Sequence, residues 1–177
     1  NHEPWSSSKM MPFLRWAKKK YKPKTVVHCG DIVDYHALSR WISEPNAYSV
    51  NTELEMAKAK LKKLYRLFPE VIVTLGNHDK IPQRRAKELC LSANFLKRAG
   101  KILEAPENWI FLTSIIFEDK YGEPILFKHI LRSGPAGALN TAIKKRMSVV
   151  GAHTHAFGGV NYHATESGVG SGIIFGA

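Results

Sequence analysis

The stretch Val71-Ile72-Val73-Thr74-Leu75-Gly76-Asn77-His78-Asp79 decides the fold of this 177-residue chain. Its first five residues form an apolar, largely β-branched run, which is typical of a buried strand. The glycine then begins a turn that delivers an amide, an imidazole and a carboxylate to one point. Because these side chains together suit a charged ligand, the stretch predicts a ligand site at the end of a strand.

A shorter strand and a long helix precede this stretch. Residues Thr25 to Cys29 form a β-branched run closed by Gly30, which predicts a strand. A capping-box pattern at Thr52 and apolar residues at helical spacing predict a helix from Thr52 to Phe68, which Pro69 ends. The resulting β-α-β unit predicts two parallel strands whose carboxyl ends lie side by side, where open α/β sheets bind ligands.

Further elements are predicted from the same kinds of pattern. They are an amphipathic helix over Lys9–Ala17, a helix over Gln83–Arg98 closed by Gly100, strands over Trp109–Phe117 and Pro124–Ile130 joined by a hairpin turn at Asp119–Gly122, a helix over Ala136–Arg146, and a strand over Ser148–Val150.

The charge and composition restrict the class of protein. The chain has 26 Lys and Arg against 15 Asp and Glu, a net charge of +11, which favours a polyanionic partner or equally well reflects lysines that solubilise helix faces. Two cysteines are too few for a disulfide framework, and no apolar run approaches the ~20 residues of a membrane span. We therefore expect a cytoplasmic protein with no membrane partner.

Both ends of the sequence look cut. No strand precedes Asn1, and the chain stops within the apolar run Ile173–Ala177. We therefore expect residues 1–177 to form one domain that is trimmed at each end.

Three predicted strand ends carry a glycine followed by polar side chains of ligand type. These are Gly30-Asp31-Ile32-Val33-Asp34, Gly76-Asn77-His78-Asp79 and Gly151-Ala152-His153-Thr154-His155. In extended chain, His153 and His155 point to the same side, and His2 and His129 add further imidazoles. One such motif alone is more often structural, but three at strand ends predict a metal site. The mixed donors suit Mn, Fe, Zn, Co or Ni better than Ca or Mg.

In this order the motifs strongly resemble the calcineurin-like metallophosphoesterase superfamily, whose blocks are Asp-x-His, Gly-Asp-x-x-Asp, Gly-Asn-His-Asp/Glu, a lone His and Gly-His-x-His. The resemblance implies an α/β sandwich of two mixed sheets flanked by helices, with the metal site at the carboxyl ends of strands. The segments Gly30–Arg40 and Leu64–Glu70, together with Trp109, look like small phosphoesterases of phages and prophages, which implies the host cytoplasm.

Carried over by position, the resemblance implies a role for each motif residue. Asp31 would bridge two divalent ions, with Mn the first choice; His2 and His155 would hold one ion, and Asn77, His129 and His153 the other. His78 would be catalytic and donate to the phosphate or leaving-group oxygen, Asp34 would orient it, and Asp79 would fix the turn. Two such ions would convert a bridging water into the attacking hydroxide.

Three departures from the family pattern are visible. The Asp expected two positions before His2 falls outside the sequence, so the first metal site lacks one ligand as written. Ile130 follows His129 where the family usually has glycine, and Ala152 precedes His153.

The substrate is predicted from local features. Gly30–Asp34 lacks the continuation typical of phosphoprotein phosphatases, and Asp34 stands where repair nucleases usually carry His. The basic stretches Lys18–Lys24, Lys80–Arg85 and Lys144–Arg146 are candidates to bind DNA or RNA, which favours phosphodiester or phosphomonoester hydrolysis on nucleic acids or nucleotides. The alternatives are a non-catalytic binding or scaffold module of the same fold and a cyclic-nucleotide phosphodiesterase. The sequence does not indicate an oligomeric state.

Overall fold

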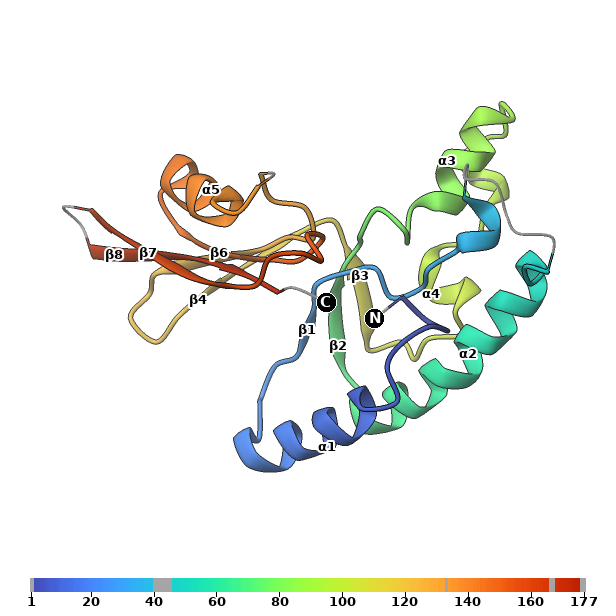
Figure 1. The fold of residues 1–177 in the computed structure, drawn as a ribbon, viewed down its shortest axis with the longest axis horizontal. Helices are drawn as coiled ribbons and strands as arrows, with labels where there is room; N and C mark the ends of the chain where they lie inside the picture. The colour runs from blue at the N-terminus through green and yellow to red at the C-terminus, as the bar shows by residue number, and fades with distance from the viewer. Residues whose placement is uncertain (1, 40–45, 133, 166–167, 176–177) are drawn as a thin grey trace.

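Two β-sheets with helices packed around them form the architecture in Figure 1, a computed structural model that describes residues 2–39, 46–132, 134–165 and 168–175. Arg40, at the end of the phage-like segment, lies outside these residues. In the first sheet, β1 (Val27–His28), β2 (Val71–Thr74) and β3 (Trp109–Leu112) lie in that order, and both pairs are parallel. This confirms the α/β class and the parallel β-α-β unit.

The helix within that unit is α2 (Val50–Leu67). It begins earlier than predicted, because Ser49 is its cap: the Ser49 hydroxyl accepts a hydrogen bond from the Thr52 amide at 3.1 Å. The capping box predicted at Thr52 is wrong because Thr52 lies inside the helix, and Glu55, its partner in that pattern, pairs with Lys58 at 2.8 Å instead. The neighbouring Glu53 points inward, where its buried carboxylate accepts from the His36 amide at 2.9 Å.

The first core lies between α2 and the three-stranded sheet. Tyr65 of α2 and Trp109 of β3 pack edge to face at 4.7 Å between ring centroids, beside the fully buried Leu61 and Val73. The polar atoms of both rings are hydrogen-bonded: the Tyr65 hydroxyl donates to the Leu103 carbonyl, and the Trp109 indole N–H donates to the Phe68 carbonyl. This packing fixes β2 and therefore the turn that follows it.

The prediction of one strand over Trp109–Phe117 is wrong. The run divides into β3, which ends at Leu112, and β4 (Ile115–Glu118), which belongs to the other sheet. The predicted hairpin joins β4 to β5 (Pro124–Phe127), and the Asp119 carboxylate accepts from the Tyr121 amide in its turn. Apolar periodicity alone does not show where a chain passes from one sheet to the next.

The single helix predicted over Gln83–Arg98 is also wrong. Helix α3 (Ile81–Glu88) ends before Cys90, whose φ of +56° is left-handed and cannot continue a helix. The 3-10 turn η2 (Ala93–Phe95) and the short helix α4 (Ala99–Ile102) follow, so Gly100 lies inside a helix instead of closing one.

The second sheet is mixed, with five strands in the order β4-β5-β6-β8-β7. Its later strands are β6 (Ser148–Gly151), β7 (Gly159–Thr165) and β8 (Gly168–Ile174), and α5 (Gly137–Lys145) covers one face. Helix α5 packs closely against β8 at Gly172, where an added Cβ would lie 2.6 Å from the Ala138 backbone. Buried side chains of α5, β5, β6 and β8 form a second, smaller core.

Two helical segments complete the fold. Helix α1 (Met10–Tyr21) extends beyond the predicted Ala17 and has no buried residue, and η1 (His36–Leu38) is a short 3-10 helix after β1. Among the described residues, no helix is both long enough and apolar enough to cross a bilayer.

The loops after β1 and β5 join the two sheets at their carboxyl ends. His129 Nδ1 lies 2.6 Å from the Cys29 carbonyl oxygen, and the Ala152 amide donates to the His129 carbonyl at 3.0 Å. His129 and the predicted motifs that follow β1 and β6 therefore meet at this junction.

Candidate metal centre

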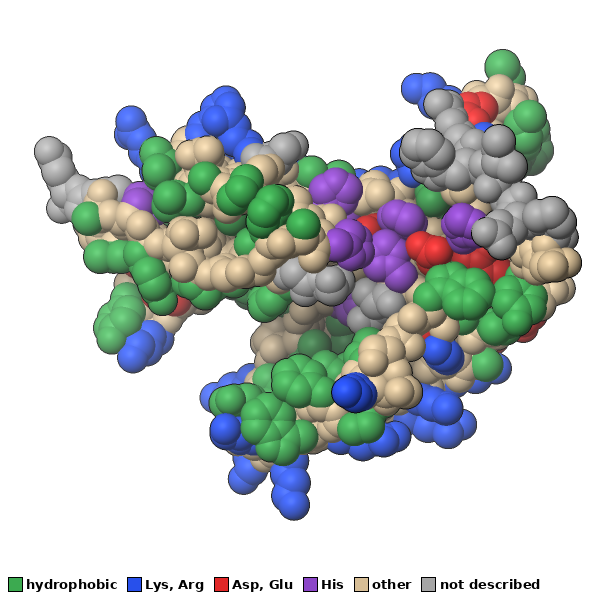
Figure 2. All heavy atoms as spheres, in the orientation of Figure 1, with side chains coloured by type: hydrophobic (Ala, Val, Ile, Leu, Met, Phe, Trp, Pro, Cys, Tyr) green, Lys and Arg blue, Asp and Glu red, His purple; other side chains and the backbone are tan. Residues whose placement is uncertain are grey.

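Histidine side chains gather at the centre of one face of the molecule, with acidic side chains beside them (Figure 2). The N-terminal segment reaches this place by pairing with the segment after β1. The His2 amide donates to the Asp31 carbonyl at 2.9 Å, and Glu3 and Val33 form a parallel bridge. The pairing brings the His2 imidazole next to the Asp31 carboxylate.

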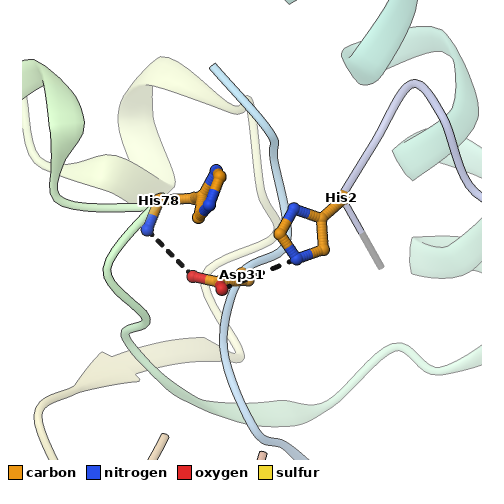
Figure 3. A group of neighbouring side chains, drawn as sticks. All are labelled: His2, Asp31 and His78. Atoms are coloured by element: carbon orange, nitrogen blue, oxygen red, sulfur yellow. Dashed lines mark hydrogen bonds and ion pairs between the residues drawn. The ribbon is translucent and has the colours of Figure 1, made fainter. Parts of the chain in front are cut away.

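Asp31 lies at the centre of the cluster and is 3% exposed. Its Oδ1 accepts a hydrogen bond from the His78 amide at 2.9 Å, and its Oδ2 lies 3.0 Å from His129 Nε2 and 3.6 Å from His2 Nε2. Burial opposes ionisation of this carboxyl, but the hydrogen bond with His129 helps to lower its pKa to about 2. Figure 3 shows the carboxylate between His2 and His78. A charged oxygen ligand is therefore held between imidazoles from different segments.

Two glycines make room for this carboxylate and for the His129 ring that faces it. A Cβ on Gly76 would lie 2.0 Å from Asp31 Oδ1, and a Cβ on Gly30 would lie 2.8 Å from His129 Nδ1. Gly30 also has a φ of +84°, which disfavours any side chain. Both positions thus require glycine, because the loops that follow β1 and β2 lie too close together to leave room for a Cβ.

Asp79 holds those loops together. Its buried carboxylate accepts from the amides of Asp31 at 2.8 Å, Ile32 at 2.9 Å and Gly76 at 2.8 Å. Burial raises the pKa of Asp79, and the amide donors oppose that shift. These contacts agree with the turn-fixing role predicted for Asp79.

On one side of Asp31 lie His129, Asn77 and His153. His129 Nδ1 donates to the Cys29 carbonyl oxygen, because a carbonyl oxygen can only accept. The other ring nitrogen, Nε2, faces Asp31 Oδ2 and Asn77 Oδ1, each at 3.0 Å. The His153 ring lies 5.3 Å from the His129 ring, and its pKa is lowered by burial and by His129. An imidazole nitrogen and two oxygens directed at one another suit a shared cation.

On the other side lie His2, His78, Asp34 and His155. Asp34 Oδ1 is 2.9 Å from His2 Nδ1 and 3.1 Å from His78 Nδ1, so it contacts both rings. The hydrogen bond with Asp34 raises the pKa of His78 to about 9 against the opposing effect of burial. Burial opposes ionisation of Asp34, yet its bonds with His2 and His78 hold its pKa below the usual range.

The His155 ring lies 4.9 Å from the ring of His2. Burial and the neighbouring His2 both lower the pKa of His155. His155 and His2 also line a cavity of about 50 Å³ together with Asp31, His129 and His153. His155 is thus near the cluster, on the His2 side.

Among the residues that the structure describes, two groups of His and Asp side chains have ligand atoms within 4.8 Å of one another: His2, Asp31 and His78, and Asp31, His129 and His153. Asp31 belongs to both, which fits a site for two metal ions. The second group brings together three residues of the expected ligand set, Asp31, His129 and His153. The first contains His78, which the resemblance assigned to catalysis, and does not include His155.

A family model of calcineurin-like phosphoesterases matches residues 1–157. The chain belongs to this family. Membership indicates a metal-dependent phosphoester hydrolase, and the family is typically dependent on two metal ions, in keeping with two ligand groups that share Asp31. No curated protein matches the chain.

Sequence reasoning missed residues that support the family site. Glu3 is 2% exposed and lies 3.8 Å from Lys60 Nζ, which anchors the N-terminal segment to α2. Arg84 donates to the Asn77 carbonyl at 3.0 Å, and Arg85 donates to the Leu38 carbonyl at 2.6 Å. The predicted basic stretch Lys80–Arg85 is therefore partly structural, and only its position next to Asn77 could have indicated this.

Proposed function

We propose that this phosphoesterase uses two metal ions to hydrolyse phosphodiester or phosphomonoester bonds in nucleic acids or nucleotides, and that residues 1–177 belong to one domain. The observation that carries the two-metal proposal is the position of the Asp31 carboxylate, 3.0 Å from His129 Nε2 and 3.6 Å from His2 Nε2. One carboxylate between two sets of imidazoles suits a site for two metal ions, since each ion would share its negative charge.

In this proposal Asp31 is a ligand shared by both ions, His2 and His155 complete one site, and Asn77, His129 and His153 complete the other. The nitrogen and oxygen donors suit Mn first, with Fe, Zn, Co or Ni as other candidates. When bound, the ions supply positive charge that lowers the pKa of a water and neutralises phosphoryl oxygens.

His78 donates a proton or hydrogen bond to the phosphate or leaving group, and Asp34 orients it. Its Nδ1 is already engaged by the Asp34 carbonyl at 2.7 Å and carboxylate at 3.1 Å, which leaves Nε2 for the substrate. The raised pKa keeps the ring cationic at neutral pH, as a donor to a developing negative charge requires.

The His78→Ala variant distinguishes a proton donor from a metal ligand. We expect turnover of bis(p-nitrophenyl) phosphate to fall by about 10²- to 10⁴-fold, the usual contribution of a general acid. Metal content, measured by mass spectrometry of the purified protein, should equal that of the wild type. His163→Ala on β7 is the matched control and should change neither quantity. If His78→Ala loses metal along with turnover, His78 is a ligand.

A basic cavity supports a polyanionic substrate. The hollow between α5 and the β4–β5 hairpin has a volume of about 610 Å³ and is lined by Lys128, Arg132, Lys144 and Lys145, with no acidic side chain among the described residues that line it. Lys128 directly precedes His129 in the chain, so a cation of this cavity and a residue of the candidate metal centre are neighbours in sequence. A phosphate backbone that extended from the centre to this cavity would meet these cations.

Charge reversal at this cavity tests the nucleic-acid proposal. For Lys144→Glu/Lys145→Glu we expect weaker binding of single-stranded DNA and a salt dependence of binding that is shallower by about 1.4 in log–log slope, because two phosphate contacts are lost. Fluorescence anisotropy at several salt concentrations measures both quantities, with Lys101→Glu on α4 as the control. Equal slopes for the wild type and the double variant would contradict binding at this cavity.

Cleavage assays with Mn on single- and double-stranded DNA and RNA test the substrate class directly. We expect cleavage of at least one of these polymers. Turnover of small aryl diesters without any polymer cleavage would contradict a nuclease, and turnover of cyclic nucleotides in addition would favour a cyclic-nucleotide phosphodiesterase.

A further inference from the structure

A pair of exposed aromatic rings lies close to the candidate metal centre. Trp5 and Tyr48 stack at 5.8 Å between ring centroids with an interplanar angle of 25°, and each is 50% exposed. Hydrophobic side chains beside the histidine cluster are visible on the same face in Figure 2. A stacked pair that is half open to solvent has free ring surface for a third planar group.

The rings form the wall of a pocket of about 250 Å³. His36, Asn46 and Glu53 also line it. The side chains of His36 and Asn46 can donate and accept hydrogen bonds, so the pocket combines flat apolar walls with a few polar groups at its edge. This composition suits an aromatic heterocycle with polar edges.

Two sets of backbone contacts fix the pocket next to the metal centre. The Trp5 amide donates to the His2 carbonyl at 2.8 Å, so a single turn separates the Trp5 ring from a candidate metal ligand. On the opposite wall, the buried Glu53 carboxylate accepts from the amides of His36 at 2.9 Å and Ala37 at 2.8 Å, two and three residues after Asp34. Both walls are thus continuations of segments that carry site residues.

We infer that the Trp5–Tyr48 pocket is a subsite for the nucleobase of the substrate, which stacks on the aromatic pair while its phosphate lies at the Asp31 centre. The inference rests on the proposed function and deepens it, since it names the part of a nucleotide that the protein recognises besides phosphate. Stacking accepts any base, because every base has a flat π face. The subsite therefore favours nucleotides over other phosphoesters without selecting a sequence.

Binding of a matched pair of ligands isolates the contribution of the base. Adenosine 5′-monophosphate and ribose 5-phosphate share the sugar and phosphate and differ in the base. We expect isothermal titration calorimetry with Mn to give a Kd for the nucleotide about tenfold lower than for ribose 5-phosphate, within the range of base–aromatic stacking. In Trp5→Ala the two Kd values should become nearly equal, and in Trp5→Phe most of the difference should remain.

The matched control is Trp16→Ala, because Trp16 on α1 is 49% exposed and Trp5 is 50% exposed. This variant should keep the tenfold difference. Tyr48→Ala provides a second test from the other side of the stack and should reduce the difference as Trp5→Ala does, which also covers the case that Trp5→Ala does not fold.

Equal Kd values for the two ligands in the wild type would overturn the inference, and so would a difference that survives in both Trp5→Ala and Tyr48→Ala. The proposed function is judged separately by hydrolysis. A protein that prefers the nucleotide in calorimetry but cleaves no phosphoester would retain the subsite and refute the proposed reaction.

Discussion

Asp31→Asn is expected to lower kcat/KM for bis(p-nitrophenyl) phosphate by at least about a thousandfold, a loss of about 4 kcal/mol in transition-state stabilisation. Asp31 is the side chain common to the two ligand groups, and its pKa of about 2 keeps it ionised at neutral pH. An amide at this position removes the negative charge that both ions would share. We therefore expect metal content to fall below one ion per chain.

Mass spectrometry for metals and steady-state kinetics measure the two effects of Asp31→Asn on the same sample. Asp119→Asn is the matched control: the same exchange in the β4–β5 turn, where one oxygen remains available to the Tyr121 amide. It should keep wild-type metal content and turnover. An Asp31→Asn protein that retained two ions and more than a tenth of the activity would contradict the shared role of Asp31.

Asp79→Ala is expected to cause the largest loss of stability, about 3 kcal/mol or more of the free energy of unfolding. The substitution leaves the amides of Asp31, Ile32 and Gly76 without their carboxylate acceptor, and each buried unpaired amide costs about 1–3 kcal/mol. Such a loss is a large part of the 5–15 kcal/mol that is typical of a domain.

Urea denaturation followed by circular dichroism measures the stability of Asp79→Ala. Asp79→Asn keeps one acceptor oxygen and should fall between Asp79→Ala and the wild type, whereas Glu107→Ala, an exposed position, should change stability by less than about 0.5 kcal/mol. A change below about 1 kcal/mol in Asp79→Ala would show that Asp79 does not hold the strand-end loops together.

Sequence patterns predicted those elements in which the apolar residues of the sequence form the face that is buried in the fold. The apolar period of α2 and the β-branched run of β2 each indicate a buried face, and both elements form. The patterns failed where tertiary contacts decide the outcome. The cap of α2 is Ser49 and not Thr52, since the helix already begins at Val50, and the run from Trp109 passes between two sheets.

The candidate site was predicted in a similar way. The glycine motifs after three strands indicated Asp31, Asn77 and His153. Asp31 and Asn77 follow the parallel neighbours β1 and β2, whose carboxyl ends lie together, whereas His153 follows β6 of the other sheet and is brought in where the two sheets meet. The pairing of Glu3 with Val33, which brings in His2, has no local signal, because a single bridge leaves no periodic pattern. The contact of Asp34 with both His2 and His78 likewise depends on that pairing.

The number of metal ions per chain tests the central claim most directly. Inductively coupled plasma mass spectrometry of the purified protein, after loading with Mn and removal of free metal, should give two ions per wild-type chain. Two ions per chain, with hydrolysis that chelation abolishes and Mn restores, is the result predicted by an Asp31 carboxylate shared between two ligand groups. A well-folded protein with no bound metal, or with one ion and full hydrolytic activity, would contradict it.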